Sequence, residues 1–144
     1  MKKFFLLALT AIATGTIAFA GPSTKKVNDH FSAAFKNAQN VTWTTSGDYN
    51  QASFTLDAQK VNAYYNEEGE LIGTTKTVAF DKLPESALET ITTKYTFPEY
   101  RLSGCIEFTD GSNNSFYYVS FENNDETVVY EISKNGKMRY FATR

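Results

Sequence analysis

This chain of 144 residues contains only one Cys and one His, and its formal net charge is small. One Cys cannot form an intramolecular disulfide, and one Cys with one His supply too few ligands for a Cys/His metal site. A formal net charge of −2 lacks the basic excess typical of nucleic-acid-binding proteins. Aromatic residues, in contrast, make up 15% of the chain, which excludes intrinsic disorder. The length suits one small globular protein rather than two domains of ordinary size.

The first 20 residues have the pattern of a secretory signal peptide. Lys2 and Lys3 precede a mostly apolar run, and Ala18-Phe19-Ala20 matches a small-x-small cleavage site. A transmembrane anchor is the alternative, but the run is short and no basic cluster follows it. We therefore predict cleavage after Ala20 and a periplasmic or secreted mature protein without a membrane span. Its 12 basic and 16 acidic residues would give a net charge of −4.

Residues 21–80 show the pattern of one helix followed by about four strands. Val27, Phe31 and Phe35 recur every four residues, as on the buried face of a short helix that Ser23 or Thr24 could cap. Apolar residues at alternate positions then predict half-buried strands, separated by turns. The alternating residues are Ala52, Phe54, Leu56, Val61, Ala63 and Tyr65.

Residues 81–144 repeat this order of elements. Pro84 is expected in the first turn of a helix, where its missing N–H costs nothing. Asn135-Gly136 favours a type I′ hairpin turn, in which both residues have positive φ. The expected apolar positions of the helix and of the following strands are Ala87, Leu88, Ile91, Tyr95, Tyr100, Leu102, Ile106, Phe108, Tyr117, Val119, Phe121, Val128, Tyr130 and Ile132.

The two halves can be aligned with each other. Adding 60 to the residue number aligns Val27 with Ala87, and adding 67 aligns Gly69 with Gly136. The second half is therefore longer, and we expect the extra residues in the polar segment 110–114, because a surface loop lengthens at little cost. We therefore predict an α+β fold: a tandem repeat of a helix-plus-four-strand unit, with an antiparallel sheet and both helices on one face. The repeats would span residues 21–80 and 81–144.

Several segments carry a family resemblance. They are Asn40-Val41-Thr42-Trp43 after a helix that ends in Phe35, Tyr49 to Phe54, Ala63 to Leu71 with its Tyr-Tyr-Asn-Glu-Glu-Gly core, and Leu83-Pro84. These segments resemble the PepSY-like, β-lactamase-inhibitor-like domains of exported Bacteroidetes proteins. The resemblance implies the tandem fold just described, no known catalytic activity, and an inhibitor-like way of acting on another protein. The chain departs from the β-lactamase inhibitory protein in lacking its disulfides, because Cys105 has no partner cysteine.

Few residues could take part in catalysis or metal binding, and each of them also has a structural interpretation. We expect His30 to pack on the flank of the first helix, and Cys105 to be a buried or semi-exposed thiol rather than a nucleophile. Asp110, Ser112 and Asn114 imitate the start of a calcium-binding loop, but Ser115 and Phe121 occupy positions that require Gly and Glu. We therefore predict a polar turn, no metal, no cofactor and no enzymatic activity.

The strand face opposite the helices is the predicted partner-binding surface. It would be largely polar in the first half and aromatic in the second, which suits protein recognition. A covering repeat, a homodimer partner or a register slip of one residue would each remove this surface. The candidate partner-binding residues are Tyr64, Phe116, Tyr118, Val129 and Phe141.

Two functions fit these observations. The first is an exported, non-enzymatic, inhibitor-like module that binds an envelope or secreted protein. The alternative is a structural envelope protein, or one that binds a small ligand or peptide. The sequence predicts no nucleic-acid partner and leaves the oligomeric state open.

Overall fold

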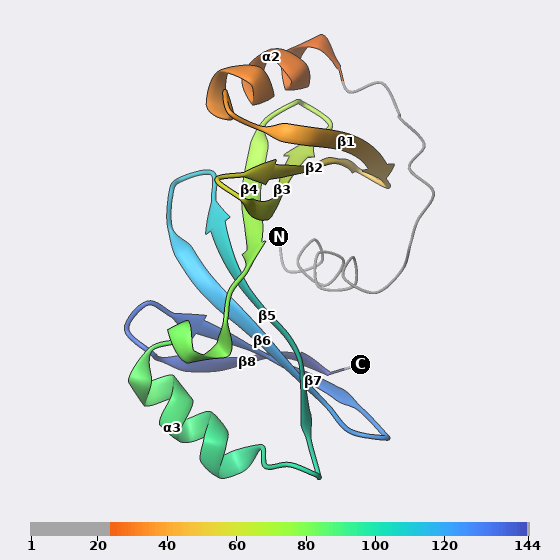
Figure 1. Cartoon of the computed structure of the whole chain (residues 1–144). Coiled ribbons are helices and arrows are strands. Elements are labelled where there is room, and N and C mark those ends of the chain that lie inside the picture. Colours follow the sequence, from red (N-terminus) through yellow and green to blue (C-terminus); the bar gives the residue numbers. More distant parts are fainter. Residues whose placement is uncertain (1–23, 144) are drawn as a thin grey trace. The chain divides into compact units, whose positions relative to one another are not determined.

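The computed structural model describes residues 24–143 and shows an α+β protein with an eight-stranded antiparallel sheet and two α-helices (Figure 1). The strands follow one another in the sheet in chain order, from β1 to β8. The predicted α+β class is therefore confirmed, whereas the predicted signal peptide lies outside the described residues. The elements are α2 (Lys25–Ala34), β1 (Gln39–Ser46), β2 (Tyr49–Leu56), β3 (Gln59–Asn66), β4 (Leu71–Thr77), the 3₁₀ turn η1 (Phe80–Lys82), α3 (Glu85–Lys94), β5 (Arg101–Asp110), β6 (Ser115–Glu122), β7 (Thr127–Ser133) and β8 (Met138–Thr143).

The described chain divides into two compact units. The first unit contains residues 24–76 together with 109–114, and the second contains 77–108 together with 115–143. Each unit holds one α-helix, which packs against strands of its own unit. The assignment of residues 21–80 and 81–144 to separate repeats stays a prediction.

Helix α2 begins and packs as its sequence predicts. The Thr24 hydroxyl accepts a hydrogen bond from the Val27 N–H at 3.4 Å, which satisfies one of the free donors at the helix start. Val27 and Phe31 are the buried residues of this helix, one turn apart. Phe31 contacts the rings of Trp43 and Phe54 at centroid distances of 5.2 and 5.0 Å. Aromatic packing thus joins α2 to β1 and β2.

Helix α3 begins one residue later than predicted. Pro84 is the N-cap, with φ −56° and ψ 137°, and does not lie in the first turn. Its carbonyl oxygen accepts hydrogen bonds from the Ala87 and Leu88 N–H groups, at 2.9 and 3.1 Å. A cap residue keeps extended geometry while its carbonyl starts the helix, and this position also needs no N–H from proline. Ala87 and Ile91 are buried on the helix face toward the sheet.

The core of the second unit lies between α3 and one face of the sheet. Ile91 and Ile132 are almost fully buried, and each such side chain contributes about 1.5–3 kcal/mol through burial. Tyr95 stacks on Phe121 with the ring centroids 4.7 Å apart. The predicted alternation of β6 and β7 is therefore confirmed, because Val119, Phe121 and Ile132 face α3. The buried residues of this core are Leu83, Ala87, Ile91, Cys105, Val119, Phe121 and Ile132.

The hairpin between β7 and β8 differs from the predicted type I′ turn. Gly136 has φ 82°, but Asn135 is not among the described residues with positive φ. The Ser133 N–H donates to the Lys137 carbonyl at 3.0 Å, so the loop holds three residues instead of two. A three-residue loop takes a type I turn followed by one left-handed residue, which is the position that Gly136 occupies. Gly69 occupies the corresponding place between β3 and β4, with φ 78°.

Candidate functional site

Four of the predicted partner-binding residues gather on the sheet face away from α3. Phe116, Tyr118, Val129 and Phe141 form one cluster there, together with buried residues of β5. The Tyr118 and Phe141 rings meet at 5.1 Å. Tyr118 and Val129 are buried, at 3% and 2% exposure, whereas Phe116 and Phe141 are half-buried. The predicted face and phase are therefore present, and partner binding by this cluster stays a prediction.

A polar group is anchored within this aromatic cluster. The Tyr118 hydroxyl donates to Glu131 Oε2 at 2.8 Å, and Arg139 pairs with Oε1 of the same carboxylate at 2.6 Å. Burial and the hydrogen bond to Glu131 raise the pKa of Tyr118 above its ordinary range. An Asp at position 118 would place two carboxylates together, so this position tests folding more than binding.

Tyr64 lies in the first unit and does not belong to that cluster. It is buried at 6% exposure, packs on Tyr49 with the ring centroids 5.9 Å apart, and lies 3.4 Å from the Thr75 hydroxyl. Burial raises its pKa above the ordinary range of tyrosine. Its neighbours on this sheet face form hydrogen bonds across the strands, from Ser53 to Asn62 at 2.7 Å and from Asn62 to Thr75 at 3.4 Å. The face is thus polar in the first unit, as the sequence predicts.

His30 and Cys105 have the structural roles that the sequence predicts. His30 is exposed on α2, and its Nδ1 lies 3.2 Å from the Tyr65 hydroxyl. Cys105 belongs to the core under α3, and burial raises the pKa of its thiol to about 11. A thiol with this pKa is almost entirely protonated at neutral pH and is therefore a poor nucleophile.

The segment that imitates a calcium-binding loop is a hydrogen-bonded turn. Asp110 Oδ1 accepts from the Ser112 and Asn114 N–H groups at 2.9 and 2.8 Å, and the Asn114 amide donates to Oδ2 at 3.0 Å. These bonds, with the Asn114 side chain first, lower the pKa of Asp110. Both carboxylate oxygens thus already have partners within the turn. Among residues 24–143, no cluster of three or more His, Cys, Asp or Glu is arranged to hold a metal ion.

A hollow that the sequence did not predict lies beside the C-terminal end of α3. It has a volume of about 300 Å³ and is lined mainly by aromatic rings and aliphatic side chains. Phe97 stands at its rim with 82% of its surface exposed, and Leu102 is 47% exposed. We call this the aromatic hollow; its lining residues are Phe80, Ile91, Thr92, Tyr95, Phe97, Tyr100, Arg101, Leu102 and Phe121.

A second, polar hollow adjoins the first, because the two share Phe97 and Arg101. It has a volume of about 540 Å³ and lies at the start of β5 and at the turn between β6 and β7. Three carboxylates and one guanidinium line it, so its charge is negative. We call this the acidic hollow; its lining residues are Phe97, Pro98, Glu99, Arg101, Glu122, Asn123, Asn124 and Asp125.

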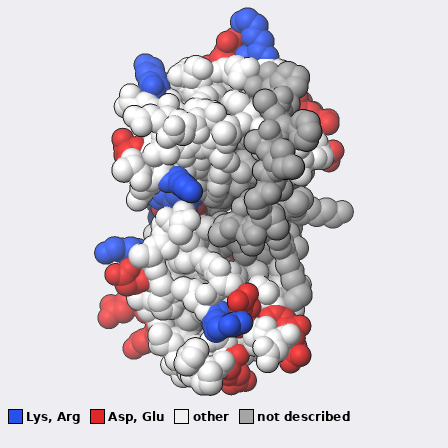
Figure 2. Space-filling model, turned by 45° about the vertical axis from the view of Figure 1, so that its right-hand side comes forward, with Lys and Arg blue, Asp and Glu red and all other residues white. Residues whose placement is uncertain are grey.

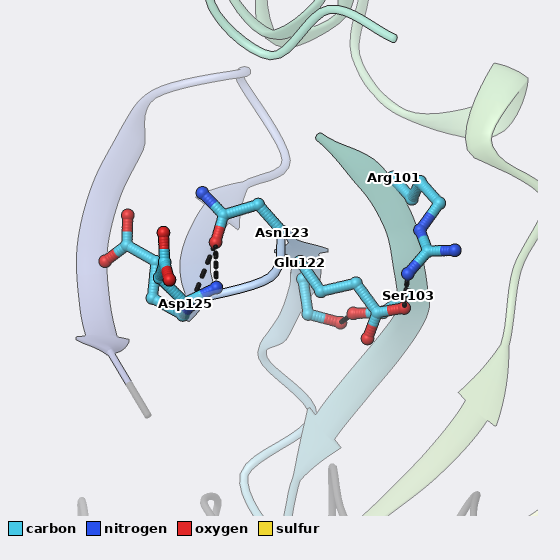
Figure 3. Close-up of polar contacts among 7 residues, drawn as sticks. Arg101, Ser103, Glu122, Asn123 and Asp125 are labelled. Atoms are coloured by element: carbon cyan, nitrogen blue, oxygen red, sulfur yellow. Dashed lines mark hydrogen bonds and ion pairs between the residues drawn. The ribbon is translucent and has the colours of Figure 1, made fainter. Parts of the chain in front are cut away.

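The wall of the acidic hollow is held in place by local contacts. Arg101 on β5 points toward Glu122 on β6, and their charged atoms lie 3.7 Å apart (Figure 3). The Asn123 Oδ1 accepts hydrogen bonds from the Asp125 and Glu126 N–H groups, both at 2.9 Å. Such an Asx turn lets a short polar segment keep one conformation. The loop therefore presents its carboxylates from a defined backbone.

Sequence reasoning missed these hollows because their residues come from three separate segments. Local pattern predicts that Phe97-Pro98 ends a helix, because the residue before Pro disfavours helical geometry, and that Leu102 is one apolar position of a strand. The acidic turn from Glu122 to Glu126 is visible in the sequence and could have suggested a negatively charged site. That this turn adjoins an aromatic hollow depends on the fold. On the face drawn in Figure 2, acidic and basic side chains are scattered among broad uncharged areas. That distribution differs from the basic stripe of a nucleic-acid-binding surface.

No family model matches this chain, and no curated protein matches it. Three solved structures from Bacteroides have the same fold. A DUF2874 family protein from Bacteroides uniformis has a TM-score of 0.71 at 11% identity, covering 85% of this chain and 89% of that one. A BLIP-like protein from Bacteroides fragilis has a TM-score of 0.69 at 14% identity, covering 90% and 88%. An inferred periplasmic protein from Bacteroides eggerthii has a TM-score of 0.69 at 10% identity, covering 83% and 90%.

These likenesses show that the chain shares a BLIP-like fold, which agrees with the β-lactamase-inhibitor-like part of the predicted resemblance. The PepSY-like part stays a prediction. No helix in the described part of the chain is both long and apolar enough to cross a membrane.

Proposed function

We propose that this chain is an exported protein-binding module that acts in an inhibitor-like way on another envelope or secreted protein, without catalysis. The observation that carries the proposal is the aromatic hollow, with Phe97 exposed at its rim. Exposed aromatic and aliphatic side chains beside a shaped apolar hollow are typical of the centre of a protein interface.

Three further observations support the proposal. The N-terminal pattern ending at Ala20 favours export, and one structural neighbour is described as an inferred periplasmic protein. Another neighbour is described as BLIP-like. Equivalent hairpin glycines in the two units, Gly69 and Gly136, support the predicted tandem repeat, because the ideal Cβ of each would lie within 3.3 Å of its own helix start.

Affinity capture tests this function. The exported form of the full chain would be immobilised and exposed to envelope and secreted fractions of its source organism. A double variant, Phe97→Asp with Leu102→Asp, would run beside it, and Tyr140→Asp would serve as the matched control because Tyr140 is 56% exposed on β8. We expect one protein to be enriched by the wild type and by the control, and lost with the double variant.

Other outcomes of this capture have defined meanings. A specific partner that is retained by the double variant would move the site to the sheet face, where Phe116→Ser is the next variant. A captured lactamase or protease would lead to an inhibition assay with that enzyme. Absence of any specific partner for the wild type would contradict the proposed function.

A small-ligand or peptide-binding role is the second candidate. The volume of the aromatic hollow favours it, because it is at the lower end of ligand pockets, which measure about 300–1,000 Å³. Native mass spectrometry of the exported protein would show a bound mass if this function is correct. A spectrum of the unliganded protein, together with a captured protein partner, would contradict it.

A further inference from the structure

We propose that the two adjoining hollows together bind a partner segment in which a large apolar side chain lies within two residues of a Lys or Arg. This inference rests on the proposed protein-binding function and names the chemistry of the partner. The apolar side chain enters the aromatic hollow, and the basic side chain reaches the acidic hollow.

The aromatic hollow selects an apolar side chain. The Tyr95 ring meets the Tyr100 ring edge to face, with the centroids 5.0 Å apart, and stacks on the Phe121 ring at 4.7 Å. Three rings that hold one another thus line the aromatic hollow. Rings held by one another lose little conformational entropy when a ligand binds. Because Phe97 is 82% exposed, covering its ring removes apolar surface from water and favours binding.

The acidic hollow selects a basic side chain. Its lining contains Glu99, Glu122 and Asp125 against the single Arg101. Arg101 is paired with Glu122, and among residues 24–143 no cation lies within ion-pair distance of the Glu99 or Asp125 carboxylates. A Lys or Arg from a partner therefore gains attraction from carboxylates for which residues 24–143 provide no counter-ion.

Neighbouring interactions hold this arrangement before a partner binds. The Tyr100 hydroxyl donates to Glu126 Oε1 at 3.0 Å, which links a ring of the aromatic hollow to the turn that borders the acidic hollow. This hydrogen bond raises the pKa of Tyr100 and keeps its hydroxyl a donor. The same turn is braced by the Asn123 side chain (Figure 3).

The spacing of the two selected side chains follows from the shared wall. Phe97 and Arg101 line both hollows, so the hollows are immediate neighbours. An extended segment advances about 3.3 Å per residue, and adjacent or next-but-one side chains reach neighbouring depressions. A small anion is disfavoured by the negative lining. A protein segment that carries both chemistries satisfies both hollows at once.

Peptide display tests the inference. Random 12-residue peptides would be selected on the exported full chain, with a parallel selection on the double variant Glu122→Gln, Asp125→Asn. We expect the wild type to enrich peptides with a large apolar residue within two positions of Lys or Arg. We expect the double variant to keep the apolar preference and lose the basic one.

Affinity measurements on one selected peptide give the size of the effect. Removing two exposed carboxylates should weaken binding about threefold to tenfold, and added salt should produce a similar loss in the wild type. Leu102→Asp should abolish detectable binding, whereas Tyr140→Asp on β8 should leave the affinity unchanged. ¹⁵N–¹H spectra of each variant would verify its fold.

Enrichment of acidic or purely apolar peptides would overturn the inference, and so would failure to enrich any peptide. If affinity capture still returns a specific partner in that case, the proposed function stands and only the assigned chemistry fails. If capture and display both return nothing, the proposed function itself fails. Selection of this chain's own segments would identify a second copy as the occupant and would also overturn the inference.

Discussion

At the residue scale, Gly136 and Gly47 differ in what surrounds them. Both have positive φ, 82° and 55°. A Cβ at Gly47 would meet nothing within 4 Å, whereas a Cβ at Gly136 would lie 1.9 Å from the Ser86 hydroxyl and 3.2 Å from the Pro84 Cβ. The left-handed backbone is thus a shared requirement, and close approach to the helix start is specific to Gly136.

We therefore expect Gly136→Ala to destabilise the protein more than Gly47→Ala. Each substitution forces alanine into left-handed geometry, at a cost of about 1–2 kcal/mol. Gly136→Ala adds the overlap with the start of α3, and the additional loss should be about 1 kcal/mol or more. Urea unfolding of both variants measures the difference. Equal losses would contradict the close packing of this hairpin on α3.

The burial of Cys105 predicts a pH dependence. Its folded pKa is about 11, above the ordinary value of 9.0, because burial disfavours the thiolate. Between these two values the unfolded chain has released the proton and the folded chain still holds it. Stability therefore falls as the pH rises from 9 to 11, and this contribution is fully present below pH 9.

The variant Cys105→Ala removes this thiol and its proton linkage. We expect urea unfolding at pH 8 and pH 10.5 to show a smaller loss of stability with pH in the variant than in the wild type. The comparison cancels the titration of the tyrosines, which both proteins retain. An identical pH dependence in the two proteins would show that Cys105 is not shielded from solvent.

At the element scale, the turn between β5 and β6 packs against β4. The Gly111 N–H donates to the Ile72 carbonyl at 3.1 Å. A Cβ on Gly111 would lie 2.5 Å from the Leu71 carbonyl oxygen, which is backbone and cannot rotate away. This contact explains why residues 109–114 group with the first unit although β5 and β6 belong mainly to the second.

Substituting Gly111→Ala should therefore shift this turn away from β4. We expect a loss of about 1–3 kcal/mol in urea unfolding, because the backbone must move to relieve the overlap. Hydrogen exchange of the amide at position 111 should be faster in the variant than in the wild type. Gly47→Ala is the control for the exchange rate at position 111, which it should leave unchanged. Unchanged exchange at position 111 in Gly111→Ala would contradict the contact.

At the scale of the whole molecule, export is the property most directly open to test. We expect the protein recovered from the envelope or medium to begin at Gly21, because Ala18-Phe19-Ala20 matches a cleavage site. Intact-mass measurement of the chain purified from its source organism determines this start. A mass that retains residues 1–20 in a membrane fraction would contradict cleavage and favour an anchor.

Local sequence pattern was enough to predict the order of the elements and, in β6 and β7, the two faces of the strands. In β5 the predicted alternation is wrong, because Tyr100 packs against the core under α3 whereas Ile106 and Phe108 lie in the cluster on the opposite face. Helical spacing at Val27 and Phe31 and alternation through Val119 and Phe121 are local consequences of side-chain period, and burial follows them. The turn at Gly136 was located correctly but assigned the wrong type, because loop length depends on the pairing of Ser133 with Lys137.

Only the fold shows which of the apolar side chains remain accessible to solvent. Tyr118 and Val129 are buried, at 3% and 2% exposure, which no local pattern predicts. Phe97, Leu102 and Asp125 are instead brought to adjoining hollows from segments about 25 residues apart in the chain. Side-chain period decides which way a residue points, but exposure depends on what the rest of the chain places over it.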